Sequence, residues 1–237
     1  MRRFDGWMPF FALILAPAAS AAGLQVTPIT LEIAREDTSA VLWLANTGTA
    51  PLQAQVRVME WTQADHEDRL APTRELVASP PMLEVAAGAR QLVRIVRTSG
   101  ATPGERERSF RLLVDELPGQ AGGQGGVQFL MRYSVPVFIA AGDPQPAAQL
   151  QWRLRDQPPA LEVTNTGSAR AQLSEVAIVD AAGARTVLSG GLLGYVLAGA
   201  QMRWPLPPDR PLPADARLHA RINGEPLDRP IAIVDGR

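Results

Sequence analysis

The sequence contains no cysteine and no lysine, and each absence removes a class of interpretation. Without thiols there can be neither a disulfide framework nor a thiolate metal site, so the cores of this protein must be held together by packing. All 23 basic residues other than histidine are arginines. If this protein binds an anionic group through a positively charged side chain, that side chain must therefore be an arginine; the alternative is binding through neutral hydrogen-bond donors.

An excess of charge of one sign is also missing. The 237 residues include 23 basic and 24 acidic side chains. Partners such as nucleic acids and anionic membranes select proteins with a basic surface, and this balance does not indicate one. We therefore expect no nucleic acid as a partner. The length favours two domains of about a hundred residues each.

The N-terminus has an apolar run, from Met8 to Ala16, that is too short to span a bilayer. It follows two arginines and leads into small residues that fit an A-x-A cleavage site after Ala21. We predict an export signal over residues 1–22, a periplasmic mature protein, and no membrane insertion after cleavage. The alternative is an uncleaved anchoring helix.

The mature chain has almost no 3.6-residue apolar period. It has short runs of alternating apolar and polar residues instead, with turn residues about every ten positions. Examples are SAVLWLAN (39–46), QAQVRVMEW (53–61), RQLVRIVR (90–97), FRLLVDELP (110–118), LEVTN (161–165) and AIVD (177–180). This pattern predicts an all-β protein made of sandwiches or small barrels.

One internal repeat favours two similar units over one large sheet. LWLANTGTAPLQAQVRV around Asn46 and LEVTNTGSARAQLSEV around Asn165 share a strand, an N-T-G turn and a second strand. Between them, AAGDPQPAAQ has the glycine and prolines of a short, semi-rigid hinge. We therefore predict domains over residues 23–140 and 150–237, with a hinge at 141–149. In the second domain, RWPLPPDRPLPADAR (203–217) should be a loop or an edge, and INGEP (222–226) a hairpin turn.

Catalytic and metal-binding patterns are weak. Asp65, His66, Glu67 and Asp68 cluster in ADHEDRL, but the other histidine, His219, falls in the second domain. A solvated hairpin tip is therefore favoured over a metal site. Similarly, PGQAGGQGG lacks the G-K-[ST] of a phosphate-binding loop and is interpreted as a flexible tether.

Two adjacent carboxylates, Asp115 and Glu116, precede Pro118 and are interpreted as a turn rather than as general acids. The sequence contains no nucleophile elbow or visible catalytic triad. We predict no enzyme activity and no cofactor.

The stretch GGQGGVQFLMRYSVPVFI, residues 122–139, combines a glycine-rich lead with a long strand. Its alternate positions are all apolar or aromatic: Val127, Phe129, Met131, Tyr133, Val135 and Val137. Such a face must be covered, either by the core of its own domain or by another protein. The loose lead, the unusual length and Pro136, which is tolerated mainly at an edge, favour another protein.

Four segments together resemble the PapD-like periplasmic pilus-assembly chaperones. They are LQVTPITLEIAREDTSAVLWLANTG (24–48), SPPMLEVAAGARQLVRIVR (79–97), GERERSFRLLVDELPG (104–119) and GVQFLMRYSVPVFI (126–139). The resemblance implies two immunoglobulin-like domains at an angle, with a cleft between them. It also implies that the seventh strand is lent to a pilus subunit, until an outer-membrane usher exchanges that strand for the extension of the next subunit.

By this resemblance Val127, Phe129 and Met131 insert into the subunit, and Tyr133 extends the row. No cofactor is implied. The free protein should then show either weak self-association through the exposed strand or disorder of the loop from Gly119 to Gly126. A secreted two-domain structural or adhesive module with no client cycle is the alternative function.

The chain departs from the family at its cations. Many members hold the carboxylate of the subunit's C-terminus with a basic residue in the first strand and a lysine in the seventh. Here VTPITLEI (26–33) has no cation, and Pro136 falls at the lysine position. Arg94 and Arg132 are the candidate anchors, because a guanidinium can grip a carboxylate with two hydrogen bonds; alternatively, Arg94 is a solvent-facing strand residue. FIAAG (138–142) replaces the family's Y-R-P-like end of the seventh strand, which puts the usual interdomain ion pair in doubt. Together these departures resemble the archaic, Csu-type branch.

Overall fold

The computed structural model describes residues 23–98, 104–118, 129–143, 145–208, 212–213 and 215–234. These residues form nineteen strands and no helix, so the all-β prediction is confirmed. No helix within these ranges is long and apolar enough to cross a membrane. The predicted export signal, the glycine-rich loop and Val127 lie outside the described residues.

The first domain is a β-sandwich of ten strands. These are β1 (Leu24–Thr27), β2 (Leu31–Ile33), β3 (Ser39–Asn46), β4 (Leu52–Ala64), β5 (Glu67–Pro72), β6 (Leu76–Ser79), β7 (Met82–Val85), β8 (Arg90–Arg97), β9 (Arg108–Leu117) and β10 (Arg132–Ile139). One sheet has the order β1-β3-β8-β6, and the other has the order β2-β10-β9-β4-β5, with β7 beside β4. Their alternate apolar side chains meet in one buried core.

The second domain repeats this plan. Its strands are β11 (Leu150–Asp156), β12 (Pro159–Asn165), β13 (Ala171–Val179), β14 (Arg185–Val187), β15 (Leu192–Val196), β16 (Gln201–Pro205), β17 (Arg217–Ile222), β18 (Glu225–Pro230) and β19 (Ile233–Val234). The sheet β16-β12-β11-β19 packs against β14-β13-β17-β18, in which β15 pairs with β13, around a second core.

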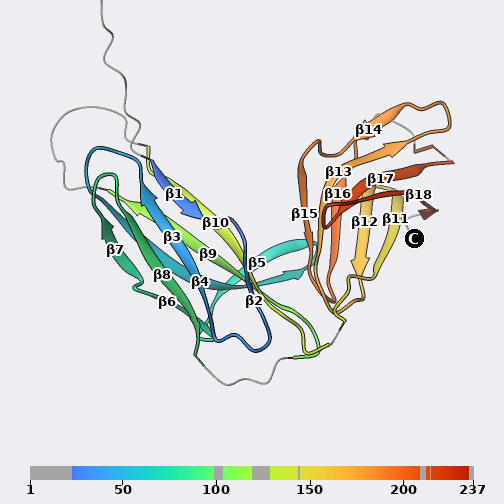
Figure 1. The fold of residues 1–237 in the computed structure, drawn as a ribbon. Coiled ribbons are helices and arrows are strands. Elements are labelled where there is room, and N and C mark those ends of the chain that lie inside the picture. Colours follow the sequence, from blue (N-terminus) through green and yellow to red (C-terminus); the bar gives the residue numbers. More distant parts are fainter. Residues whose placement is uncertain are drawn as a thin grey trace, which may run out of the picture.

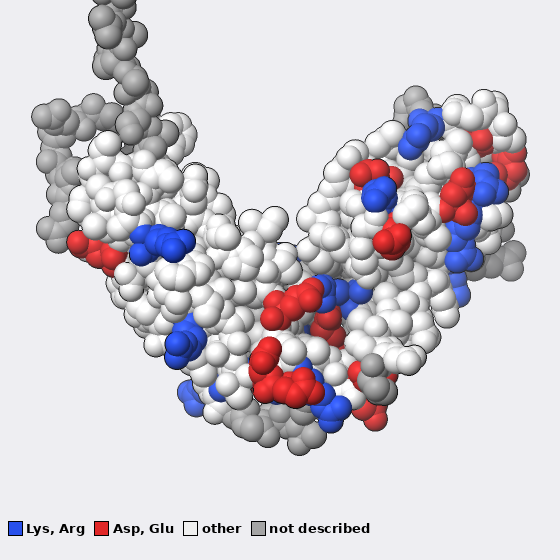
Figure 2. All heavy atoms as spheres, viewed as in Figure 1, with Lys and Arg blue, Asp and Glu red and all other residues white. Residues whose placement is uncertain are grey.

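The two immunoglobulin-like domains form the arms of an open V (Figure 1). Strand β10 runs from the tip of the first arm down to the joint, and the β4–β5 hairpin extends from the first arm to the second (Figure 1). No strand lies between Ile139 and Leu150 among the described residues, and the hinge boundaries at 141–149 stay a prediction. Figure 2 shows a hollow between the arms, with charged side chains gathered at the joint and much of the first arm uncharged.

The two N-T-G turns are built alike. The side-chain amide of Asn46 donates to the carbonyls of Ala50 and Val85, and its oxygen accepts from the Gly48 N–H. Asn165 makes the same three kinds of bond in the second domain, to Ala169, Val196 and Gly167. Both asparagines are buried, so each satisfies its own polar atoms and fixes the turn between two strands.

Several local predictions agree with these strands. SAVLWLAN and RQLVRIVR are β3 and β8, and the proline-rich segment begins with the edge strand β16. Asn223 and Gly224, both with positive φ, form the two-residue turn between β17 and β18.

One local prediction is wrong. Asp115 and Glu116 are not in a turn; they are buried residues of β9. The sequence pattern failed here because the two carboxylates are paired within the fold, which permits their burial in a strand.

Candidate functional site

The apolar row of β10 is divided into a buried half and an exposed half. Val135, Val137 and Ile139 belong to the core of the first domain. Before the strand begins at Arg132, the sequence alternation continues back to Met131 and Phe129, which are 41% and 84% exposed. The chain thus presents large apolar groups at the tip of the first arm, in continuation of a row that it buries elsewhere.

Tyr133 marks the boundary between these halves. Its ring packs partly against the core, and its hydroxyl donates a hydrogen bond to the Leu24 carbonyl in β1. Of the four residues predicted to form the binding row, the structure describes Phe129, Met131 and Tyr133; Tyr133 lies in β10, whereas Phe129 and Met131 precede the strand and are exposed.

One backbone edge of β10 is unpaired over most of its length. Strand β9 pairs with β10 from Arg132 to Ile139, whereas β2 pairs only from Val137 onward. Within the described residues, no strand pairs with the other edge of Arg132 to Pro136. That edge carries main-chain groups that a strand from another chain can pair with.

The main chain just before β10 is held in position by β9. The Glu116 N–H donates to the Met131 carbonyl over 2.9 Å, and the Met131 N–H donates to the Glu116 carboxylate over 3.2 Å. The exposed apolar side chains therefore project from a backbone that is already positioned beside the sheet.

Arg57 and Arg132 share the carboxylate of Asp115 on the face of the sheet that points away from the core. Arg57 in β4 donates to Asp115 over 2.7 and 3.2 Å, and Arg132 donates to the other oxygen of the same carboxylate. An open groove of about 510 Å³ is lined by these residues together with Gln55, Glu116, Leu117, Leu130 and Met131. Burial alone would raise the pKa of the Asp115 carboxyl, but the hydrogen bonds and charges of Arg57 and Arg132 outweigh it and hold that pKa below its usual range.

The two arginines predicted as carboxylate anchors do not lie together. Arg132 is in β10, on the face of its sheet that points away from the core. Arg94 is an exposed residue of β8, in the other sheet of the sandwich, between the buried Val93 and Ile95. Strand alternation points Arg94 away from the core on the opposite side of the domain, so these two guanidinium groups cannot hold one carboxylate together.

Arg111 is a third cation that sequence reasoning missed. It lies in β9 directly opposite Pro136, the position at which the family's lysine is absent. Its guanidinium stacks 3.7 Å from the Trp61 ring centroid and 5.7 Å from that of Tyr195. Burial lowers the pKa of this guanidinium, and no carboxylate forms an ion pair with it among the described residues. Only the register of β9 against β10, which the sequence does not display, could have identified it.

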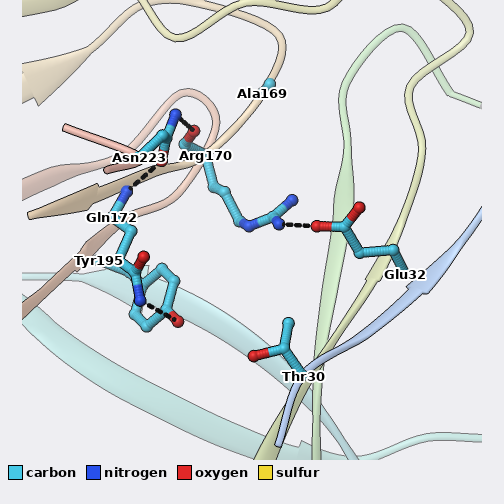
Figure 3. Close-up of a pocket in the computed structure, with 7 residues that line it drawn as sticks. All are labelled: Thr30, Glu32, Ala169, Arg170, Gln172, Tyr195 and Asn223. Atoms are coloured by element: carbon cyan, nitrogen blue, oxygen red, sulfur yellow. Dashed lines mark hydrogen bonds and ion pairs between the residues drawn. The ribbon is translucent and has the colours of Figure 1, made fainter. Parts of the chain in front are cut away.

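An ion pair between the domains is present, formed by residues that sequence analysis did not name. Arg170, just before β13, reaches across the joint to the carboxylate of Glu32 (Figure 3). It also forms an ion pair with the carboxylate of Glu107. Its guanidinium also lies 3.6 Å from the Phe138 ring centroid. Burial is the largest influence on the Glu107 carboxyl and raises its pKa, although Arg170 partly opposes this effect. A pocket of about 410 Å³ lies beside this pair, lined by Thr30, Glu32, Ala169, Arg170, Gln172, Tyr195 and Asn223 (Figure 3).

The ADHEDRL segment is the turn of the β4–β5 hairpin, as predicted. Asp65 and His66 both have positive φ at the tip. The tip is not fully solvated, however, because His66 forms a β-bridge with Met202 of the second domain. Among the described residues no group of three or more histidine, cysteine or acidic side chains is arranged to hold a metal ion.

Residues 23–142, half of the chain, match the model of a protein family described as pili and flagellar-assembly chaperone, PapD N-terminal domain. A similar solved structure is that of the CsuC–CsuE chaperone–tip adhesion subunit pre-assembly complex, from archaic chaperone-usher Csu pili of Acinetobacter baumannii. The identity is 24%, the TM-score is 0.67, and the match covers 91% of this chain and 100% of that one.

Two further structures are similar along nearly the same length. The Pseudomonas aeruginosa CupB2 chaperone is 16% identical with a TM-score of 0.64, and the match covers 89% of this chain and 100% of that one. A chain from the complex of the Salmonella enterica SafA pilin with the SafB chaperone is 18% identical with a TM-score of 0.63, covering 90% and 97%. Among curated protein sequences, no match was found.

Proposed function

Because the chain belongs to the family of pili and flagellar-assembly chaperones, we propose that it stabilises pilus subunits by lending them the segment that leads into β10. One observation carries this proposal: the apolar row of β10 continues beyond the core into the exposed Phe129 and Met131, along an edge that lacks a partner strand. By the same proposal Val127 extends the row and Tyr133 ends it.

The energetics of such a complex follow from the two parts of this edge. Each large apolar side chain that enters a subunit groove contributes about 1.5–3 kcal/mol through burial. Main-chain hydrogen bonds along the free edge add affinity, and the alternate side chains provide the fit; strand addition of this kind is a known mode of recognition between pilus chaperones and pilins. An incomplete subunit that lacks one strand is the partner with this complementary shape.

The cellular setting belongs to the same proposal. An export signal over residues 1–22 places the mature protein in the periplasm, where an outer-membrane usher receives the subunit. The likeness to the CsuC–CsuE complex, together with the missing first-strand cation and Pro136, supports the archaic branch. Weak self-association through the free edge is expected at high protein concentration, because the same edge can pair with a second copy.

For the carboxylate of the subunit's C-terminus we propose two alternative anchors. Arg132 has most of its side chain exposed, and Arg57 supports it through Asp115. Arg111 lies about 13 Å further along the sheet, four residue positions closer to the joint, so one carboxylate cannot reach both. Arg94 faces away from both positions. The variants Arg132→Gln and Arg111→Gln therefore separate the alternatives, with Arg94→Gln as the matched control.

Co-expression with a candidate subunit tests strand lending. We expect Phe129→Arg and Met131→Asp to abolish recovery of the complex while leaving the melting temperature of the free protein unchanged, because both side chains are already exposed. The control is Val187→Asp in β14, which changes an apolar side chain of the second domain that is 60% exposed. Full recovery of the complex with both β10 variants would refute the proposal, as would a large loss of stability in the free protein.

A further inference from the structure

The β4–β5 hairpin belongs to the first domain but extends to the second. Near its tip the Gln63 side-chain amide makes two hydrogen bonds to the second domain. Its nitrogen donates to the Tyr195 carbonyl over 2.9 Å, and its oxygen accepts from the Leu197 N–H over 2.8 Å. A carbonyl and an N–H two residues apart are the groups that a neighbouring parallel strand would pair with. The Gln63 amide therefore takes the place of the N–H and C=O that one residue of such a strand would supply.

The orientation of that amide is itself fixed. The Gln63 nitrogen also donates to the Asp68 carboxylate across the hairpin, over 2.9 Å. This bond identifies which end of the amide is the donor, since a carboxylate can only accept. The hydrogen bond to Asp68 thus fixes the orientation of the Gln63 side-chain amide toward the second domain.

An aromatic cluster surrounds this contact. Trp61 and Phe138 of the first domain pack with Tyr195 and Leu197 of the second, and all four side chains are at least nine-tenths buried. The Trp61 and Tyr195 rings meet edge to face, with centroids 5.4 Å apart. His66 adds the β-bridge to Met202 at the hairpin tip.

We infer that Gln63 is a positioning residue that sets the angle between the two domains. Domains joined by a short linker move relative to one another unless their interface prevents it. Here the hydrogen bonds of the β4–β5 hairpin connect the two domains on one side of the joint and so close that side. The Arg170 ion pairs and the hydrogen bond from the Glu107 N–H to the Ser168 carbonyl, 2.8 Å long, close the other. A cavity of about 240 Å³, lined in part by Gln63, Glu107 and Leu197, separates the two sides.

The test uses Gln63→Met, which keeps the length of the side chain and removes both hydrogen bonds to the second domain. The matched control is Gln55→Met, because Gln55 lies in the same strand, an even number of positions from Gln63, and lines a groove formed by residues of the first domain. Hydrogen exchange is followed at the Glu107 amide, which Gln63 does not touch. Solution X-ray scattering measures the spread of the two domains.

We expect Gln63→Met to speed exchange of the Glu107 amide about fivefold and to broaden the distribution of interatomic distances, with no change for Gln55→Met. The Leu154 amide, bonded to the Ala232 carbonyl inside the second domain, should exchange unchanged in both. Exchange that rises only at Leu197, with an unaltered scattering curve, would overturn the inference.

Should Gln63→Met lower the stability of both domains, Gln63→Glu decides. That variant keeps an oxygen acceptor for the Leu197 N–H but loses the donor to both the Tyr195 carbonyl and the Asp68 carboxylate, so the Glu107 amide should again exchange faster than in the Gln55→Met control. An unchanged Glu107 amide in Gln63→Glu would overturn the inference. None of these measurements uses a subunit, so their outcome does not depend on the proposed chaperone function.

Discussion

The apolar row that leads into β10 has two parts with the same chemistry and opposite environments. Val135 and Val137 are enclosed by the two sheets of the first domain, whereas Phe129 and Met131, on the same row, are exposed to solvent. The side chains of the exposed half are the larger ones. Sequence alternation fixes which side chains share a face, but the neighbouring strands decide which part of that face the protein covers by itself.

The largest effect should come from placing a charge in the enclosed half. We expect Val137→Asp to cost more than about 4 kcal/mol in the free energy of unfolding, because an unpaired carboxylate would lie in an apolar core. Phe129→Asp, in the exposed half, should cost less than about 0.5 kcal/mol. Urea denaturation of both variants measures the contrast. Equal costs would mean that the row is not divided as described.

A smaller effect is expected at the boundary between the halves. Tyr133→Phe removes the hydroxyl that donates to the Leu24 carbonyl and leaves the ring in place. The loss should be about 1 kcal/mol, the net contribution of one hydrogen bond. Thermal unfolding reports this loss, and the effect on subunit binding should be slight because the exposed side chains are unchanged. A variant as stable as the natural protein would contradict the prediction.

The smallest effects concern the carboxylates of Asp115 and Glu107, which lie near opposite ends of β10. The pKa of Asp115, near the exposed half, is lowered, so its contribution to stability is present above the usual pKa of aspartate and is lost as the pH falls through its folded value. The pKa of Glu107, at the joint, is raised. Its ionisation therefore opposes folding, and that cost is relieved as the pH falls through its folded pKa.

NMR titration of the carboxyl carbons can check both signs. We expect Asp115 to titrate below an unfolded reference peptide and Glu107 to titrate above it. Denaturation across the acidic range in Asp115→Asn and Glu107→Gln should remove slopes of opposite sign. Shifts in the same direction for both carboxyl groups would contradict the comparison.

Much of the fold was predictable because the strands alternate clearly and the turns carry their own chemistry. Both N-T-G turns, the Asn223–Gly224 hairpin and the edge position of β16 depend on local residue types. Which strands pair depends on contacts distant in sequence, and sequence reasoning accordingly missed Arg111 opposite Pro136 and the contact of the hairpin with the second domain. Arg94 is a second example. Sequence analysis placed it in a strand, but it could not show that this strand lies in the other sheet, with the Arg94 side chain pointing away from β10.

The start of β2 at Leu31 limits how far a visiting strand can advance along β10. From Val137 onward β2 already occupies that edge, and Pro136 offers no N–H. The free edge therefore ends at about Ser134, and its described part, from Phe129 onward, covers some six residues or roughly 20 Å. A partner strand can therefore pair toward the joint only as far as about Ser134. The remaining residues of a longer strand must lie beyond the tip of the first arm.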